Sequence, residues 1–220
     1  FLQGVQHGWT NKRMQLIRQT REGSRFQRLM NYWGIEGSSA DDWHLLDFLF
    51  YNSTSVKDME TELQKGADVN HIQVGMGITK LQEAARDNMV EVVKLLLKYE
   101  AKVDFYNKSM IWPSSNPNNH QVRRVTPLIL AINNGHLEVV KLLLENGADV
   151  DLKITSVPVR NMTPLISAIR NDHLEIFKTL LTYGADVNLW GPLIHASERG
   201  NLEIVKILLS KGADVNYSYY

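Results

Sequence analysis

Apolar residues recur along this chain in paired runs with helical spacing. One such pair contains Leu128, Ala131 and Ile132 in its first run and the apolar-rich stretch 139–144 in its second. Apolar residues three and four positions apart share one face of a helix, and the polar stretch 133–135, which ends in glycine, interrupts that pattern. The spacing predicts two short antiparallel helices joined by a tight turn.

Two short strings repeat together with these runs. A turn-like string, Gly-Ala-Asp-Val-Asn/Asp, follows the second run and occurs in five copies, one of them altered: Gly66–Asn70, Glu100–Asp104, Gly147–Asp151, Gly184–Asn188 and Gly212–Asn216. Thr-Pro-Leu, or an altered form of it, precedes the first run at Thr79, Thr126, Thr163 and Gly191. The two strings are 21 residues apart in all four of these units, and a fixed period indicates a repeat fold.

The strings also predict where the helices begin and end. A threonine hydroxyl can cap a helix N-terminus, and proline is tolerated at the first helical position. These roles are expected of Thr126, Thr163, Pro127, Pro164 and Pro192. Glycine after a helix accommodates a left-handed backbone, as expected at Gly147, Gly184 and Gly212. The aspartates that follow should hydrogen-bond the turn backbone; they are Asp68, Asp149, Asp186 and Asp214.

The combined motifs of residues 126–151 resemble the ankyrin repeat. The tetratricopeptide repeat has a similar period, but its pattern of Trp, Gly, Tyr and Pro is missing here. The resemblance covers 75–216, and 41–70 resembles a degenerate first unit. It implies an all-α solenoid of stacked antiparallel helix pairs joined by hairpin loops, within an ankyrin repeat domain at 41–220. The expected units are about 41–70, 75–104, 123–151, 160–188 and 189–216.

Residues 1–40 do not fit the repeat. They hold six Lys or Arg residues against Glu22 and Glu36, and the stretch 37–39 is a candidate linker. We interpret 1–40 as a basic helical cap on the first repeat or the remnant of a preceding domain. The chain ends inside a turn that would lead to another unit, so the natural protein is expected to continue.

The connectors between units vary in length while the helical block does not. The steps are 13, 26, 16 and 7 residues. The 26-residue step contains an insertion at 105–125 with residue types that are enriched in interface hot spots: Phe105, Tyr106, Trp112, Arg123 and Arg124. The alternative is that Ile111 and Trp112 only pack on the adjacent hairpin. The 7-residue step leaves almost no hairpin, so Leu189 and Trp190 should be partly exposed.

A repeat array presents its first helices and hairpins as an extended concave surface. His195 aligns with Leu130, Ser167 and Glu83 on the first-helix face expected to line this groove. The candidate partner-binding residues outside the insertion and the short connector are Asn133, Arg160, Arg170, His195 and Arg199.

The candidate chemistry beyond binding is sparse. His136 and His173 occupy the same repeat position, which favours a structural role, and the histidines lack the spacing of a zinc site. The sequence contains no cysteine and none of the common nucleotide-binding or nucleophile-elbow motifs. We therefore expect no catalytic residue, no metal and no cofactor in this chain.

Composition indicates which classes of partner are not expected. Lys and Arg number 24, as do Asp and Glu, so the formal net charge is zero. Strong attraction to nucleic acid or an anionic membrane is not expected, nor is a membrane span, because the apolar runs are too short. The lack of cysteine favours an intracellular, cytoplasmic location, which would be the host cytoplasm for a secreted effector. A monomer is favoured.

Two function classes fit these observations. The first is a protein–protein interaction module that binds its partner through the groove and the hairpin loops. The alternative is the targeting or substrate-recruiting half of a larger enzyme, such as a bacterial effector, whose catalytic domain lies outside this fragment. A catalytic motif in the flanking sequence would distinguish the two.

Overall fold

The computed structural model describes residues 55–72, 77–106, 111–112, 121–122, 125–152 and 162–218. The chain divides into two compact units, 1–71 and 72–220. In the first unit, α4 (Val56–Gln64) is followed by the turn at Gly66, and its Met59 and Leu63 side chains are buried. The predicted cap at 1–40 lies outside the described residues and stays a prediction.

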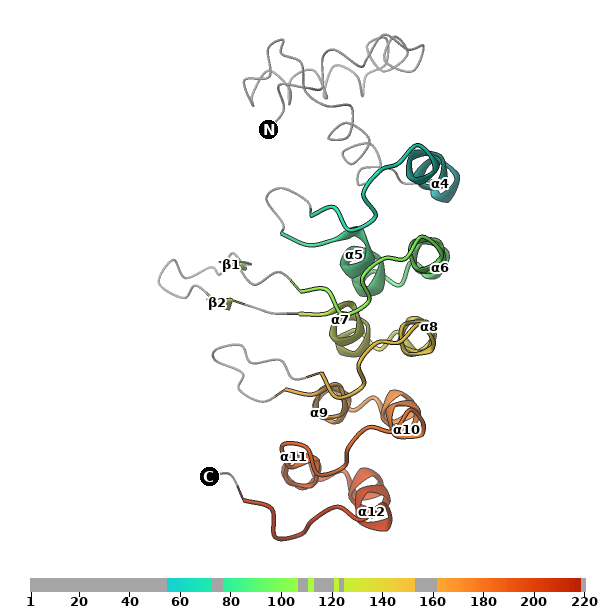
Figure 1. Cartoon of the computed structure of the whole chain (residues 1–220). Helices are drawn as coiled ribbons and strands as arrows, with labels where there is room; N and C mark the ends of the chain where they lie inside the picture. The colour runs from blue at the N-terminus through green and yellow to red at the C-terminus, as the bar shows by residue number, and fades with distance from the viewer. Residues whose placement is uncertain are drawn as a thin grey trace. The chain divides into compact units, whose positions relative to one another are not determined.

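The second unit is built from helix pairs that stack in chain order (Figure 1). Each first helix has seven residues, and these helices are α5 (Lys80–Arg86), α7 (Pro127–Asn133), α9 (Pro164–Arg170) and α11 (Pro192–Glu198). Each second helix has nine, and these are α6 (Val90–Lys98), α8 (Leu137–Glu145), α10 (Leu174–Thr182) and α12 (Leu202–Ser210). First and second helices form separate layers, which confirms the predicted solenoid of stacked pairs.

The helices begin and end where the punctuating residues predict. The Thr126 and Thr163 hydroxyls accept hydrogen bonds from the amides of Ile129 and Ile166 at 3.3 and 3.2 Å. Proline follows each cap at the first helical position. The glycines after α8, α10 and α12 have φ of +86° to +87°, the left-handed region that favours glycine at a helix end. Local sequence therefore sets the length of each block.

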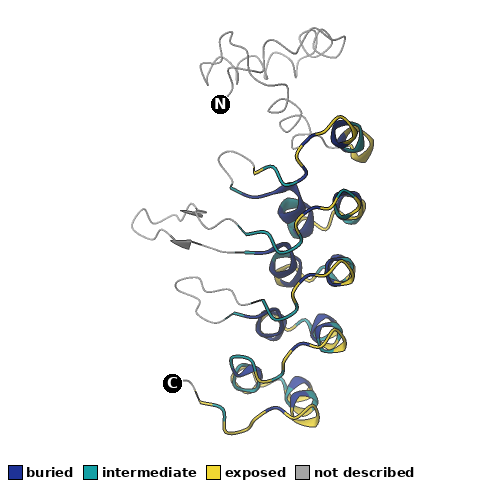
Figure 2. Ribbon diagram, in the orientation of Figure 1, coloured by how far each residue is buried: buried dark blue, intermediate teal, exposed yellow. Residues whose placement is uncertain are grey.

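The core lies between the two helix layers of the second unit (Figure 2). Its largest side chain is Phe177, which is fully buried, as are Leu143 of α8 and Leu165 of α9. The buried positions repeat at helical spacing, as in Leu128 and Ile132 of α7. Each repeat therefore buries its apolar faces against its own partner helix and against its neighbours.

The aspartates of the turn string make the predicted contacts. The side chain of Asp149 accepts a hydrogen bond from the amide of Asp151 at 2.9 Å, and the equivalent bonds at Asp68, Asp186 and Asp214 are 2.8 Å. A second set of bonds joins adjacent repeats. The Asp104 carboxylate accepts from the Asp149 amide at 3.1 Å, and Asp151 accepts from Asp186 in the same way. Burial raises the pKa of Asp104.

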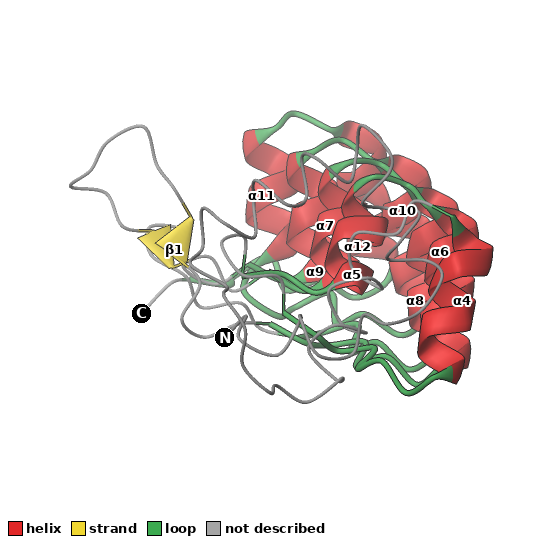
Figure 3. Cartoon of the chain, turned by 90° about the horizontal axis from the view of Figure 1, so that it is seen from above, coloured by secondary structure: helices red, strands yellow, loops and turns green. Residues whose placement is uncertain are grey.

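The connectors differ as their lengths require. The 26-residue step carries a short antiparallel pair, β1 (Ile111–Trp112) and β2 (Gln121–Val122), on the side of the first helices (Figure 3). These two strands add to the predicted all-α fold. The 7-residue step is only a turn, with Trp190 and Gly191 at φ +63° and +64° before α11 begins. Leu189 and Trp190 are half-buried there, as predicted.

Candidate protein-binding surface

A row of polar residues marks the C-terminal ends of the first helices. We define the inner row as the last residue of each first helix together with the next residue. Its members are Arg86–Asp87, Asn133–Asn134, Arg170–Asn171 and Glu198–Arg199. The side chains change from repeat to repeat, and all except Arg86 are exposed. The first helices therefore present a different chemistry at each level of the stack.

The second helices carry a constant pattern instead. We define the outer row as the Glu and Lys at the second and fifth positions of each second helix, namely Glu91 and Lys94, Glu138 and Lys141, Glu175 and Lys178, and Glu203 and Lys206. Lys178 contacts both Glu175 and Glu203 of the next repeat at 3.2 Å. Hydrogen bonds to these glutamates raise the pKa of Lys178. Lys94 and Lys178 of the outer row thus form ion pairs with glutamates of the same row.

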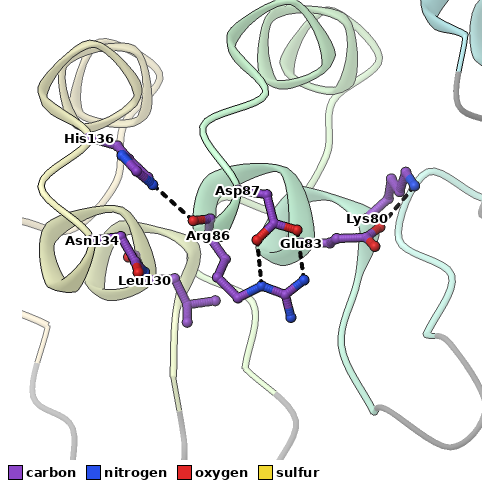
Figure 4. Close-up of polar contacts among 7 residues, drawn as sticks. All are labelled: Lys80, Glu83, Arg86, Asp87, Leu130, Asn134 and His136. Atoms are coloured by element: carbon purple, nitrogen blue, oxygen red, sulfur yellow. Dashed lines mark hydrogen bonds and ion pairs between the residues drawn. The ribbon is translucent and has the colours of Figure 1, made fainter.

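The first level of the inner row is an internal ion pair (Figure 4). The guanidinium of Arg86 donates to both carboxylate oxygens of Asp87 at 2.7 Å, and these hydrogen bonds lower the pKa of Asp87. The ring Nε2 of His136 lies 2.9 Å from the Arg86 carbonyl oxygen. That contact joins two adjacent repeats and gives His136 a structural position.

The middle level is a set of oriented amides. The Oδ1 atom of Asn133 accepts from the Ser167 hydroxyl at 2.6 Å and from Asn171 Nδ2 at 3.1 Å. Asn171 Nδ2 also donates to the Ser167 carbonyl at 2.8 Å. Ser167 is fully buried, so its hydroxyl binds the Asn133 amide from the side of the protein core. These bonds occupy the oxygen of the Asn133 amide and the nitrogen of the Asn171 amide, which leaves the opposite end of each amide as the available hydrogen-bonding group.

The last level surrounds His195. Its ring Nδ1 lies 3.6 Å from Glu198 Oε2. Burial lowers the pKa of His195, the nearby Arg170 guanidinium lowers it further, and Glu198 opposes both effects. Arg199 donates to the Arg170 carbonyl oxygen. A shallow hollow opens beside these residues and is lined by Asp172, Glu198, Arg199, Gly200, Asn201 and Leu202.

The structure brings some of the predicted binding residues together. Asn133, Arg170, His195 and Arg199 lie on three adjacent first-helix levels. The other described candidates lie on the connectors and are half-buried: Phe105, Tyr106, Leu189 and Trp190. The Trp112 side chain and residues Arg123, Arg124 and Arg160 lie outside what the structure describes.

Sequence reasoning missed Asn171 and Asp87. Both directly follow a first helix, and aligning the repeats at that position shows Asp, Asn, Asn and Arg. That variation is a usable signal. The sequence does not show that one of these residues neutralises an arginine while another orients an amide, because those contacts depend on rotamers and on the neighbouring repeat.

Two further observations limit the chemistry of the described part of the chain. Its His, Asp and Glu residues form no group of three or more that could hold a metal ion. None of its helices is long and apolar enough to cross a membrane.

Comparison with known proteins identifies the repeat. A family model described as ankyrin repeats (3 copies) matches residues 51–154, 108–189 and 153–219. The chain belongs to the ankyrin repeat family. Ankyrin repeats are in general protein–protein interaction modules, and the family is a non-catalytic fold.

A relative supports the same assignment. The ankyrin chain is 35% identical over 96 residues to the ankyrin repeat and KH domain-containing protein mask-1 of Caenorhabditis elegans. The match covers 44% of this chain and 3% of the worm protein. The chain therefore corresponds to a small part of that relative.

Proposed function

We propose that this ankyrin repeat chain binds a partner protein through its inner row and its connectors, including the insertion at 105–125. One observation carries the proposal. The outer row keeps Glu and Lys at the same positions in all four repeats of the second unit, whereas the inner row differs at every level. Repetition is what a scaffold needs, and variation at a fixed place on that scaffold is what specific recognition needs.

The residue types at this surface support recognition of a protein. Arg, Trp and Tyr are enriched among interface residues that dominate binding energy. Phe105 and Tyr106 are the first two residues of the insertion, and Trp190 lies in the short connector. All three residues are half-buried. Half-buried aromatics on a packed scaffold offer apolar area at low entropic cost. The surface therefore combines apolar contacts at the connectors with hydrogen-bonding groups in the inner row.

The balanced composition supports a protein over a polyanion. The formal net charge of zero supplies no long-range field that would concentrate nucleic acid at the chain. The absence of cysteine from the sequence is compatible with a reducing intracellular compartment. We accordingly propose that a monomer binds a protein partner inside the cell, without nucleic acid.

Replacing Trp112, Arg123 and Arg124 together with alanine should weaken partner binding at least about tenfold, the loss of roughly one interface hot spot. The thermal midpoint should change little, because loop residues are expected to contribute recognition more than core burial. The partner is isolated with the full chain, and its affinity is measured by titration calorimetry.

A matched triple variant in the outer row, with Glu138, Lys141 and Lys206 changed to alanine, serves as the control and should keep full affinity. If the insertion variant instead retained its affinity, or lost binding only together with a large fall in midpoint, the insertion would be a packing element and this proposal would fail there.

A further inference from the structure

Two arginines at the same repeat position have different surroundings. Arg86 ends α5 and Arg170 ends α9. Asp87 follows Arg86 and forms two hydrogen bonds with its guanidinium, each 2.7 Å long. Asn171 follows Arg170 and carries no charge. The first level therefore contains its own carboxylate, whereas the third level lacks one.

The Arg170 guanidinium is exposed, and within the described residues no carboxylate lies at ion-pair distance from it. Arg199 places a second guanidinium beside the Arg170 main chain, because it donates to the Arg170 carbonyl oxygen. The neighbouring acids have other partners. Asp172 accepts from Asn201 at 2.5 Å, and Glu198 lies beside His195. An exposed guanidinium with no carboxylate at ion-pair distance presents a planar set of N–H donors that matches the two oxygens of a carboxylate.

The adjacent amides present a different kind of complement. Both donors that reach Asn133 use its Oδ1, and its Nδ2 donates to no group among the described residues. Asn171 uses its Nδ2 for both of its side-chain bonds, and its Oδ1 accepts from no group among the described residues. One oriented donor beside one oriented acceptor matches the N–H and C=O groups of an extended peptide. The two amides can therefore hydrogen-bond the main chain of a bound peptide whatever its side chains are.

We propose that an extended acidic segment of the partner lies along the inner row, with its main chain on Asn133 and Asn171 and one carboxylate on Arg170. The Arg86–Asp87 pair shows within the same fold the geometry that this carboxylate adopts. This inference rests on the proposed function and specifies the partner chemistry of the same surface.

A carboxylate fits this place better than a phosphate or a nucleic acid. Arg170 and Arg199 supply two positive charges, while Asp172 and Glu198 supply two negative charges close by. The formal charges of these four side chains sum to zero, so they would repel a polyanion as much as they attract it. A single carboxylate gains the short-range hydrogen bonds of the guanidinium without needing a net field.

The test uses a phage-displayed library of random 12-residue peptides selected on the full chain. Selected peptides should share Asp or Glu at one aligned position. In fluorescence anisotropy, Arg170→Gln should raise the Kd of these peptides about tenfold, because a charge-assisted hydrogen bond contributes on the order of one factor of ten. Lys141→Gln in the outer row is the matched control and should change the Kd less than about twofold, because it also removes one exposed positive charge but lies outside the inner row.

The peptide offers a second control. Changing its shared Asp to Asn should weaken binding to the wild-type chain but have little further effect on the Arg170→Gln chain, as expected for two groups in direct contact. Thermal midpoints of both variants should match the wild type, because both changes are at the surface.

Other outcomes overturn the inference. Peptides without a shared acidic position, equal losses in the Arg170 and Lys141 variants, or no selected peptide at all would each refute an acidic extended segment. The proposed function would stand in those cases if the insertion variant still lost its partner. If a peptide with phosphoserine at the shared position bound more tightly than the peptide with Asp or Glu, the group recognised by Arg170 would be a phosphate and the carboxylate proposal would be wrong.

Discussion

Leu143→Ala should lower the free energy of unfolding by about 2–5 kcal/mol, the range measured for buried leucines. Leu143 is 0% exposed, and its helix, α8, packs against α6, α7 and α10. Removing its side chain loses apolar burial and leaves a cavity that three surrounding helices cannot readily close. Urea unfolding followed by circular dichroism and by tryptophan fluorescence measures the change.

The same substitution at Leu202 provides the control. Leu202 begins α12 and is 70% exposed, so its replacement should change stability by less than about 0.5 kcal/mol. A cost below about 1 kcal/mol at Leu143 would mean that the helix faces are assigned wrongly. Both probes are needed because repeat arrays can unfold in segments.

Gly191→Ala should destabilise the chain by about 1–3 kcal/mol, the usual range for a strained backbone position. Gly191 lies at the shortest connector with φ +64°, where a side chain is unfavourable. An added Cβ would also lie 2.7 Å from a ring carbon of Tyr217, much closer than van der Waals contact. The thermal midpoint by differential scanning calorimetry reports the combined cost.

Gly184→Ala separates the two causes. Its φ is +87°, but an added Cβ would meet no atom within 4 Å. This variant should therefore cost only about 1 kcal/mol, the backbone strain alone. Equal costs at the two glycines would show that the Tyr217 ring does not constrain the connector.

The regular part of this fold was predictable because local residues determine it. The Thr126 and Thr163 caps, the prolines after them and the glycines after the second helices fix each block within a residue or two. Those effects act over one turn of helix, so a single sequence contains them. Likewise the turn aspartates bond to an amide two residues ahead, which sequence spacing reveals directly.

Contacts between repeats were not predictable in the same way. The bond from the Asp149 amide to Asp104 spans 45 residues, and the bond from Ser167 to Asn133 spans 34. Each depends on how one repeat is placed on the next. The candidate surface shares this dependence, since the Asn133 amide is held by Ser167 and Asn171 of the next repeat. The sequence predicted candidate binding positions, and the structure showed which of their side chains are hydrogen-bonded within the chain.

The central claim, that the inner surface binds the partner, is tested most directly by site-specific photo-crosslinking in the intact complex. A photoreactive residue is placed at exposed positions of the inner row, Asn134 and Glu198, and at exposed positions of the outer row, Lys141 and Lys206. We expect crosslinks to the partner from the inner positions and none above background from the outer positions. Crosslinks from Lys141 and Lys206, with none from Asn134 and Glu198, would contradict the account.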